Sequence, residues 1–353
     1  MKDENCEFLL PYCSSIKAVM MLIVVLSHSC AMWSINGWFA TPAESCLLLG
    51  CLSDWLGTFD VPVFVFMSGY LYAYLKLETN RYDSMAKVIV KKIKRLLLPY
   101  VVVCVFWAIP FWLLFFEKSE IVSKYVLGES PSQLWFLLML FWLFVIFETI
   151  CLTASEKIKR GSASLWIVVF CFYIISFLMS ALPHGSILQI QAAFKYAPFF
   201  YAGFTLRRSG VMPKYRFPYL LLLMAASFVL LALSGSLSNY GKLPAYFDAA
   251  AIWFLARAVG ISMVLQVVLL AINIDKPVDS AMLSSFWSRL KDNSMGIYLL
   301  HQQLAWCILS VMNNGLISPI VIASVAFVFS LIVSLVISAV LRKWPIARFA
   351  LGG

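Results

Sequence analysis

The sequence predicts an all-α, polytopic integral membrane protein with about ten transmembrane helices. Three observations support this fold class: 62% of the 353 residues are hydrophobic, only 12% are charged, and the apolar residues gather in long runs. Soluble domains carry roughly 25% charged residues. A soluble fold leaves much of its chain facing water, and this chain has too little polar surface to cover itself. The composition therefore excludes a soluble enzyme, a disordered chain and a disulfide-rich secreted module.

Each predicted helix is an apolar run close to the length of about 20 residues that a bilayer requires. Because backbone polar groups in the hydrocarbon must be satisfied within the segment, runs of this length predict helices. The ten spans are predicted at 15–34, 56–76, 96–116, 133–152, 164–182, 193–206, 217–234, 246–272, 293–312 and 317–341. Residues 45–55 are interpreted as an amphipathic segment that leads into the second span. Nothing between the spans could fold alone, so residues 1–353 are expected to form a single transmembrane domain without a separate soluble domain.

The basic residues set the expected orientation. Of the 27 Lys and Arg residues, 21 fall in loops on the side of the N-terminus and only Lys118, Lys124 and Lys242 fall in loops on the other side. Cytoplasmic loops of membrane proteins carry such an excess. We therefore expect both termini in the cytoplasm, and we attribute the net charge of +10 to these loops rather than to nucleic-acid binding.

A few ionisable residues lie inside the predicted spans, where they are costly and mark candidate functional sites. Glu148, Lys195 and Asp248 lie near span ends, so we expect their side chains to reach the interface by snorkelling. The others are Lys17, His28, Asp60, Arg257 and His301. The nine cysteines form no metal-ligand or disulfide spacing, so no metal is expected.

Lys17 and His28 lie eleven residues apart on the first span. That spacing returns to nearly the same helix face, about 16 Å further along the axis. Lys17 is then at the cytoplasmic mouth, and His28 lies beyond the midplane. A histidine in this position can take a proton from a hydroxyl nucleophile. The alternative is a core histidine that is hydrogen-bonded between helices.

Asp60 begins the second span from the opposite side, so it is expected at a depth similar to that of His28. A carboxylate beside an imidazole fixes its tautomer and stabilises its charged form. The alternative is that Asp60 caps its helix, with Pro62 in the first turn, and both roles are compatible.

Two further patterns each have two interpretations. Ser68 and Gly69 lie deeper in the second span, where a glycine permits either close helix packing or the passage of a thin ligand. Lys92 and Arg95 belong to the basic run at 91–100. Such cations can hold the phosphates of a cytoplasmic ligand, or they can set topology and attract anionic lipid.

Six fragments carry a resemblance to a known family: VVLSHS (24–29), FDVPVFVFMSGYLYAY (59–74), KKIKRLLLPY (91–100), LWFLLML (134–140), APFFYAGFTLRR (197–208) and SMGIYLLHQQ (294–303). In this order they resemble acyltransferase family 3 of integral membrane proteins, which includes bacterial O-antigen and other polysaccharide O-acetyltransferases. The resemblance implies a multi-pass enzyme of the bacterial cytoplasmic (inner) membrane. It implies an O-acetyltransferase that moves an acyl group from cytoplasmic acetyl-CoA to a hydroxyl of an extracytoplasmic or lipid-linked glycan.

The resemblance also assigns residues. The family's essential histidine falls on His28, and the arginine usually found eleven residues earlier is Lys17 here. Two family arginines spaced three apart correspond to Lys92 and Arg95, so one of them is again lysine. His301 matches the histidine of a late YLxH motif.

Together, the residue patterns and the family resemblance predict that the phosphates of acyl-CoA lie near Lys17, Lys92 and Arg95. They predict that its pantetheine arm lies near Ser68 and Gly69. The thioester is then expected near the general base on the first span.

His28, supported by Asp60 or another polar group, is expected to deprotonate the sugar hydroxyl. Direct transfer and an acyl-imidazole intermediate both fit the sequence. Arg257 and His301 are assigned to the acceptor side, where Arg257 would stabilise an oxyanion, hold an acidic acceptor group or pair with a buried acid.

A transporter or flippase of a glycan precursor is the alternative function, in which the same intramembrane charges would line a substrate path. The sequence shows no internal repeat or paired broken helices, which favours the enzyme. A degenerate relative retained as a complex subunit is a third interpretation.

Overall fold

The computed structural model describes residues 9–34, 37–79, 81–153, 163–179, 186–209 and 281–352, with three isolated positions at 182, 222 and 225. The regular structure in these ranges is helical. The spans expected at 217–234 and 246–272, and with them Asp248 and Arg257, lie outside the described residues.

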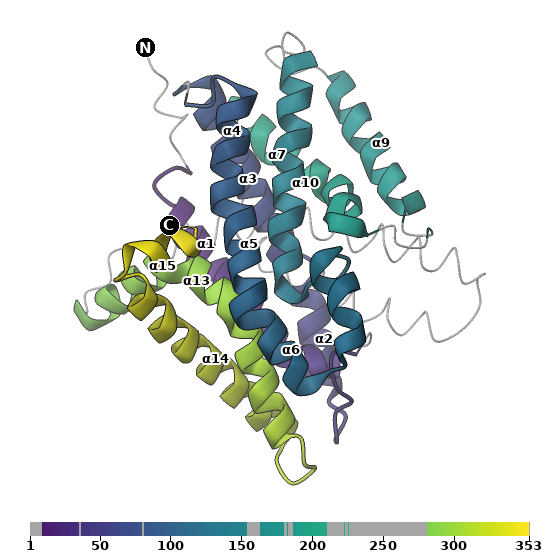
Figure 1. Cartoon of the computed structure of the whole chain (residues 1–353), viewed down its shortest axis with the longest axis vertical. Helices are drawn as coiled ribbons and strands as arrows, with labels where there is room; N and C mark the ends of the chain where they lie inside the picture. The colour runs from purple at the N-terminus through teal and green to yellow at the C-terminus, as the bar shows by residue number, and fades with distance from the viewer. Residues whose placement is uncertain are drawn as a thin grey trace.

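The helices in chain order are α1 (Cys13–Cys30), α2 (Leu47–Leu56), α3 (Asp60–Leu77), α4 (Met85–Lys92), α5 (Leu98–Val103), α6 (Ile109–Phe115), α7 (Trp135–Thr153), α9 (Ala163–Met179), α10 (Ile190–Ser209), α13 (Ala281–Met312), α14 (Pro319–Leu341) and α15 (Pro345–Ala350). Short 3-10 or π segments join or extend several of them. In Figure 1 the long helices stand side by side as a bundle, with α13 and α14 forming an inclined pair at one corner.

Six helical segments in the described ranges are long and apolar enough to cross a membrane: Cys13–Trp33, Leu47–Leu77, Met85–Phe115, Ser132–Thr153, Ser284–Met312 and Pro319–Leu341. They confirm the all-helical class and coincide with six of the predicted spans. The predicted fifth span corresponds to the shorter apolar helix Leu165–Met179, and the sixth lies within α10. The total of ten and the cytoplasmic placement of the termini remain predictions.

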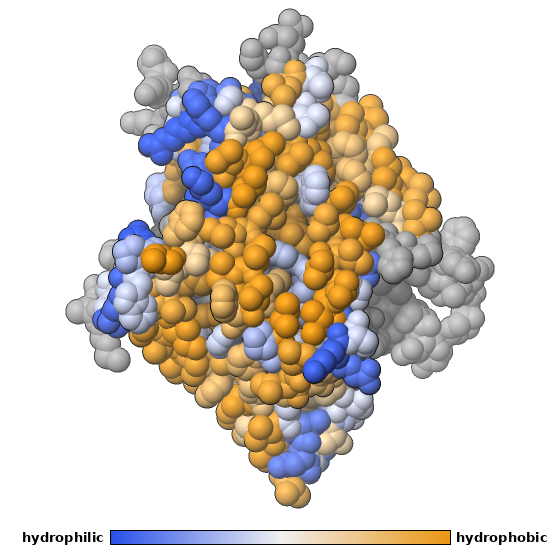
Figure 2. All heavy atoms as spheres, in the orientation of Figure 1, coloured by the Kyte–Doolittle hydropathy of each residue, from blue (hydrophilic) through white to orange (hydrophobic). Residues whose placement is uncertain are grey.

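The outer surface of the bundle is apolar. The exposed apolar side chains of α14 include Val321, Val325, Val328, Ile332 and Val336. Figure 2 shows hydrophobic residues across the middle of one face, with hydrophilic residues gathered toward its upper left and lower ends. Such a continuous apolar band would be unfavourable in water and matches the hydrocarbon of a bilayer.

Helices α3 and α10 touch backbone to backbone through two glycines. A Cβ atom on Gly69 would lie 1.9 Å from the carbonyl oxygen of Phe200, and one on Gly203 would lie 1.9 Å from that of Phe66. Only glycine fits at such a crossing. The structure therefore uses Gly69 for close helix packing, which was one of its two interpretations.

The segment Met85–Phe115 stays helical through two prolines. Pro99 and Pro110 lie in the first turns of α5 and α6, and a π-helical turn precedes each of these helices, at Ile93–Leu97 and Cys104–Ala108. Proline lacks an N–H and clashes with the carbonyl four residues earlier, and a π-turn absorbs that mismatch. The basic run is thereby carried on one helical column with the apolar span.

The expectation that Glu148 snorkels to the interface is wrong. Its side chain is 0% exposed, the Tyr72 hydroxyl donates to Oε1 at 2.6 Å, and Lys76 Nζ lies 2.8 Å from Oε2. Tyr72 and Lys76 come from α3, so the buried carboxylate on α7 is stabilised by a cation from another helix rather than by water.

Candidate active site

A cavity of about 720 Å³ lies between α1, α3, α7 and α13. Its wall on α1 includes Lys17, Met21, Val24 and His28, which follow one another at steps of three or four residues. These positions share one helix face, so the cavity follows α1 from Lys17 to His28, about 16 Å along the axis. Its volume falls in the range of small-molecule sites, roughly 300–1,000 Å³.

Helix α3 forms a second wall by the same periodicity. Asp60, Phe64, Ser68 and Leu75 line the cavity, whereas Gly69 faces α10 and is not part of the lining. Ser68 is thus placed where a ligand can reach it, and Gly69 is not.

Asp60 lies at one end of the cavity. It is the first helical residue of α3, with Phe59 in the capping position, and its Oδ1 accepts from the Val61 N–H at 2.6 Å. Its side chain is almost fully buried, so Asp60 contributes a desolvated carboxylate to the cavity lining.

Three cations predicted from the sequence meet in this cavity. Lys17, Lys92 and Arg95 all line it, and Lys92 is repelled by the charges of the other two. The Lys92 ammonium also lies 3.5 Å from the ring centroid of Phe144. A group of like charges held together in this way favours binding of an anion.

Tyr82 belongs to the cationic end of the cavity and was missed by the sequence analysis. Its ring is 2% exposed, and the ammonium groups of Lys91 and Lys92 each lie 5.4 Å from its centroid. Burial raises the pKa of the Tyr82 phenol, partly offset by the nearby charge of Arg95. The hydroxyl is therefore protonated at neutral pH and can donate a hydrogen bond to an anion. No motif singled it out, because a lone tyrosine before a basic helix is common.

His28 is paired with His301. His28 Nδ1 lies 2.8 Å from His301 Nε2, and the two rings are stacked with centroids 5.0 Å apart and planes 12° apart. The two residues are separated by 273 positions in the sequence, and the contact follows from the packing of α1 against α13.

Hydrogen bonding fixes the tautomers of this pair. His301 Nδ1 lies 3.0 Å from the carbonyl oxygen of Ile297 and 2.9 Å from that of Tyr298. Carbonyls only accept, so Nδ1 carries the proton and Nε2 of neutral His301 is an acceptor. His28 Nδ1 therefore donates to His301, which leaves the lone pair of His28 on Nε2. The arrangement therefore leaves neutral His28 with its ring lone pair on Nε2.

A buried amide cluster holds α13 at the level of this pair. Gln133 Nε2 donates to the Leu299 carbonyl at 2.7 Å and to Gln303 Oε1 at 2.8 Å, and the Tyr298 hydroxyl donates to the Gln133 carbonyl. Every buried polar group in this cluster has a partner, so it fixes the helix that carries His301.

A second carboxylate, that of Asp54 on α2, lines the cavity. It accepts from the Ser34 hydroxyl at 2.6 Å. Its neighbour Ser53 exchanges hydrogen bonds with Ser27, the residue before His28. The sequence analysis treated this segment only as a lead-in and did not identify Asp54.

Six of the predicted site residues thus line this one cavity: Lys17, His28, Asp60, Ser68, Lys92 and Arg95. His301 was predicted to contact the acceptor, but the structure buries it fully behind His28. Arg257 is among the residues that the structure does not describe. Within the described ranges, no group of three or more His, Cys, Asp or Glu side chains is placed to hold a metal ion.

These features define a class of protein: a helical membrane protein with a cavity that joins a cationic end to a paired histidine. The sequence matches the acyltransferase domain family over residues 11–341, and the chain belongs to this family, acyltransferase family 3. The resemblance seen in the sequence is thereby confirmed, and it supports a membrane acyltransferase.

Curated relatives include glucans biosynthesis protein C. The proteins of this name from Escherichia coli strains K12 and SMS-3-5 are each 27% identical to the chain over 161 residues, and that from Escherichia coli O139:H28 (strain E24377A) is 28% identical. The aligned region covers 42% of this chain and 40% of each relative, so the chain spans about two fifths of the length of these relatives. No solved structure matches the chain.

Proposed function

We propose that the protein is a membrane O-acyltransferase that transfers an acyl group, acetyl as the family default, from cytoplasmic acyl-CoA to a hydroxyl of an extracytoplasmic or lipid-linked glycan such as O-antigen. The observation that carries the proposal is the His28–His301 pair on a cavity that also holds Lys17, Lys92 and Arg95. The family supports the reaction class, and the name of the glucan-related relatives supports a glycan acceptor.

The cavity suits an acyl-CoA donor. Coenzyme A carries phosphates at one end and a thioester at the other, joined by a slender, largely uncharged arm. The cations at one end of the cavity would pair with the phosphates. Met21, Val24, Phe64 and Ser68 would flank the arm, because they line the stretch between the cations and His28.

In the direct reaction, His28 Nε2 removes the proton of the acceptor hydroxyl as its oxygen attacks the thioester carbonyl. The C–S bond then breaks, and the proton passes from His28 to the departing thiolate. In the two-step alternative, Nε2 attacks the thioester carbonyl first and the C–S bond breaks to release the thiolate. The acceptor oxygen then attacks the acyl-imidazole, His28 leaves with its Nε2 lone pair restored, and the hydroxyl proton passes to the thiolate. In both, His301 is assigned as a positioning residue that keeps Nε2 of His28 unprotonated at the start.

Asp60 is proposed to act at the same end of the cavity. A buried carboxylate near an imidazole stabilises the cationic form that arises when the base takes a proton. It can also accept a hydrogen bond from a second hydroxyl of the acceptor and so orient the sugar.

The proposal is tested by analysing O-acetyl groups on the surface glycan of cells that carry the intact protein, the His28→Ala variant or no protein. We expect O-acetylation only with the intact protein, because the variant lacks the base. Unchanged acetylation with His28→Ala at an equal protein level would falsify the catalytic assignment. Loss of the glycan itself from the surface, rather than of its acetyl groups, would favour a flippase.

A further inference from the structure

Arg342 is a fourth cation on the cavity that holds Lys17, Lys92 and Arg95. In the sequence it counted only as loop charge on the cytoplasmic side. Its Nη1 donates to the backbone carbonyl of Asp292 on α13. A carbonyl is a neutral acceptor, so this bond orients the guanidinium without neutralising it and leaves its other N–H donors available.

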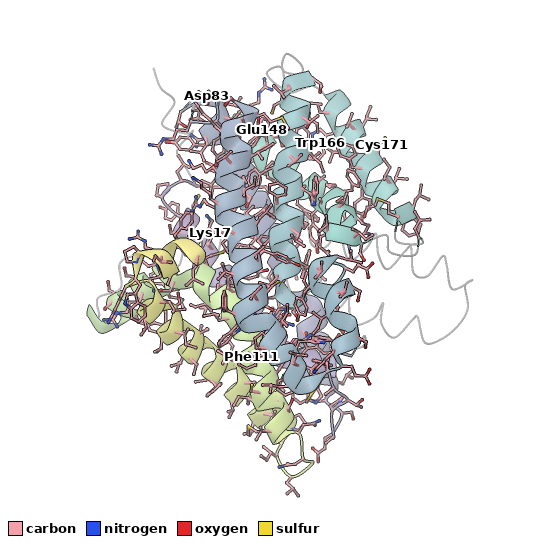
Figure 3. The ribbon with its side chains drawn as sticks, in the orientation of Figure 1. Lys17, Asp83, Phe111, Glu148, Trp166 and Cys171 are labelled. Atoms are coloured by element: carbon pink, nitrogen blue, oxygen red, sulfur yellow. The ribbon has the colours of Figure 1, made fainter. Side chains whose placement is uncertain are left out.

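The residues after Arg342 complete the same end of the cavity. Helix α15 turns the chain back toward α5, the Leu351 side chain is buried in the core, and Leu351 and Gly352 line the cavity. Gly352 has φ +79°, and a Cβ atom there would lie 3.0 Å from the carbonyl oxygen of Arg95. Figure 3 shows Lys17 near this segment, which is drawn in the last colours of the chain. Segment 342–352 is therefore packed against the residue that we assign to the donor phosphates.

We propose that Arg342 binds a phosphate of the acyl donor, and that segment 342–352 forms the wall of the donor site beside Arg95. This inference rests on the proposed function. The diphosphate and 3′-phosphate of coenzyme A carry a combined charge of about −4. Lys17, Lys92, Arg95 and Arg342 are four basic residues around one cavity, and Arg342 adds a guanidinium that stays charged at any physiological pH.

The position of Arg342 on the cavity distinguishes binding of a donor phosphate from attraction to lipid headgroups. Arg342 is one of the residues that line the cavity and is only partly exposed, whereas lipid headgroups contact the outer surface of the bundle. Arg348 offers a matched comparison, because it lies on α15 in the same segment, is exposed and is not part of the lining.

The experiment measures binding of acetyl-CoA to the purified full-length protein in lipid nanodiscs. We expect Arg342→Gln to weaken binding about tenfold, the size of one charge-assisted hydrogen bond, and Arg342→Lys to weaken it less. Arg348→Gln removes the same charge from the same segment and should bind as the unmodified protein does. The thermal midpoint of each variant is recorded alongside.

Two further donors separate phosphate binding from a structural role. With 3′-dephospho-acetyl-CoA, loss of the difference between Arg342→Gln and the unmodified protein assigns Arg342 to the 3′-phosphate, and persistence assigns it to the diphosphate. With S-acetylpantetheine, which has no phosphate, the two proteins should bind equally.

A tenfold loss that persists with S-acetylpantetheine would overturn the inference, because Arg342 would then act only by holding α13 to α14. Equal binding of acetyl-CoA by Arg342→Gln and the unmodified protein would overturn it as well. Failure of the unmodified protein to bind acetyl-CoA would instead count against the proposed function, and the inference would fall with it.

Discussion

The basic atom of His28 is determined by residues that never need to touch a substrate. Two carbonyl oxygens of α13 hold the proton on His301 Nδ1, and His301 Nε2 then holds the proton on His28 Nδ1. A histidine with free rotation and two tautomers would present its lone pair only part of the time. The pair therefore gives His28 a fixed tautomer, in the way that a buried acid does in a catalytic triad.

Replacing His301 tests this role. We expect His301→Ala to lower kcat about 10- to 100-fold with little change in the KM for acetyl-CoA, because the base stays but loses its orientation. His301→Gln places an amide that can accept from His28 Nδ1, so it should retain more activity than His301→Ala. The measurement is steady-state kinetics of both variants across pH. Equal loss in the two variants, or a change confined to KM, would contradict a positioning role.

The sequence predicted His28 and His301 as separate candidates but did not predict that they meet. Each lies in an apolar span at a position where a polar group is costly, which is a local signal that a sequence carries. Their 2.8 Å contact depends on how α1 crosses α13, and periodicity along one helix does not fix that crossing. Three of the four cations on the cavity, Lys17, Lys92 and Arg95, were predicted from the sequence, whereas Arg342 was counted there only as loop charge.

At the scale of helices, Glu148 shows where the prediction from span position fails. The distance of a charged side chain from a span end decides whether it can reach water. A side chain of opposite charge on another helix can stabilise it without water. Lys76 of α3 supplies that partner for α7, and its own side chain is only 17% exposed. Apolar run length predicted both helices, whereas the pairing between them required the packed structure.

Breaking this pair should destabilise the bundle. We expect Glu148→Gln to lower the free energy of unfolding by about 3 kcal/mol, because it leaves the Lys76 ammonium largely buried without a counter-charge. A double substitution, Lys76→Met with Glu148→Leu, should recover most of this loss. Thermal unfolding in nanodiscs reports both. As a control, Lys87→Ala removes an exposed pair with Asp83 and should change the stability by less than about 1 kcal/mol.

The crossing of α3 and α10 allows a similarly direct test. A methyl group on Gly69 has no room beside the Phe200 carbonyl, so Gly69→Ala should force the two helices apart and lower the thermal midpoint by several degrees. Gly57→Ala adds the same methyl group where the nearest atom is 3.4 Å away, and it should leave the thermal midpoint near that of the unmodified protein. Equal midpoints for the two variants would show that the crossing is not tight.

For the molecule as a whole, the two ends of the cavity differ in charge. Lys17, Lys92 and Arg95 gather at one end, and the carboxylates of Asp54 and Asp60 share the lining with His28. If the cationic end opens to the cytoplasm, donor and acceptor approach the histidine from different sides, and the acyl group crosses the membrane within the protein. The orientation of the chain is therefore part of the mechanism rather than a detail of topology.

That orientation can be measured with single cysteines in a variant that lacks the nine native ones. Asp83 and Phe111 lie toward opposite ends of the column α4–α6 (Figure 3), and Lys118 follows α6 as an exposed residue. We expect Lys118→Cys to react with a membrane-impermeant maleimide on intact spheroplasts, and Asp83→Cys to react only after lysis, because the distribution of basic residues predicts that the basic side faces the cytoplasm. The reverse pattern would put the cationic end outside, where acyl-CoA is absent, and would contradict the proposed direction of transfer. Surface acetylation by each cysteine variant confirms that the labelled protein is folded in the membrane.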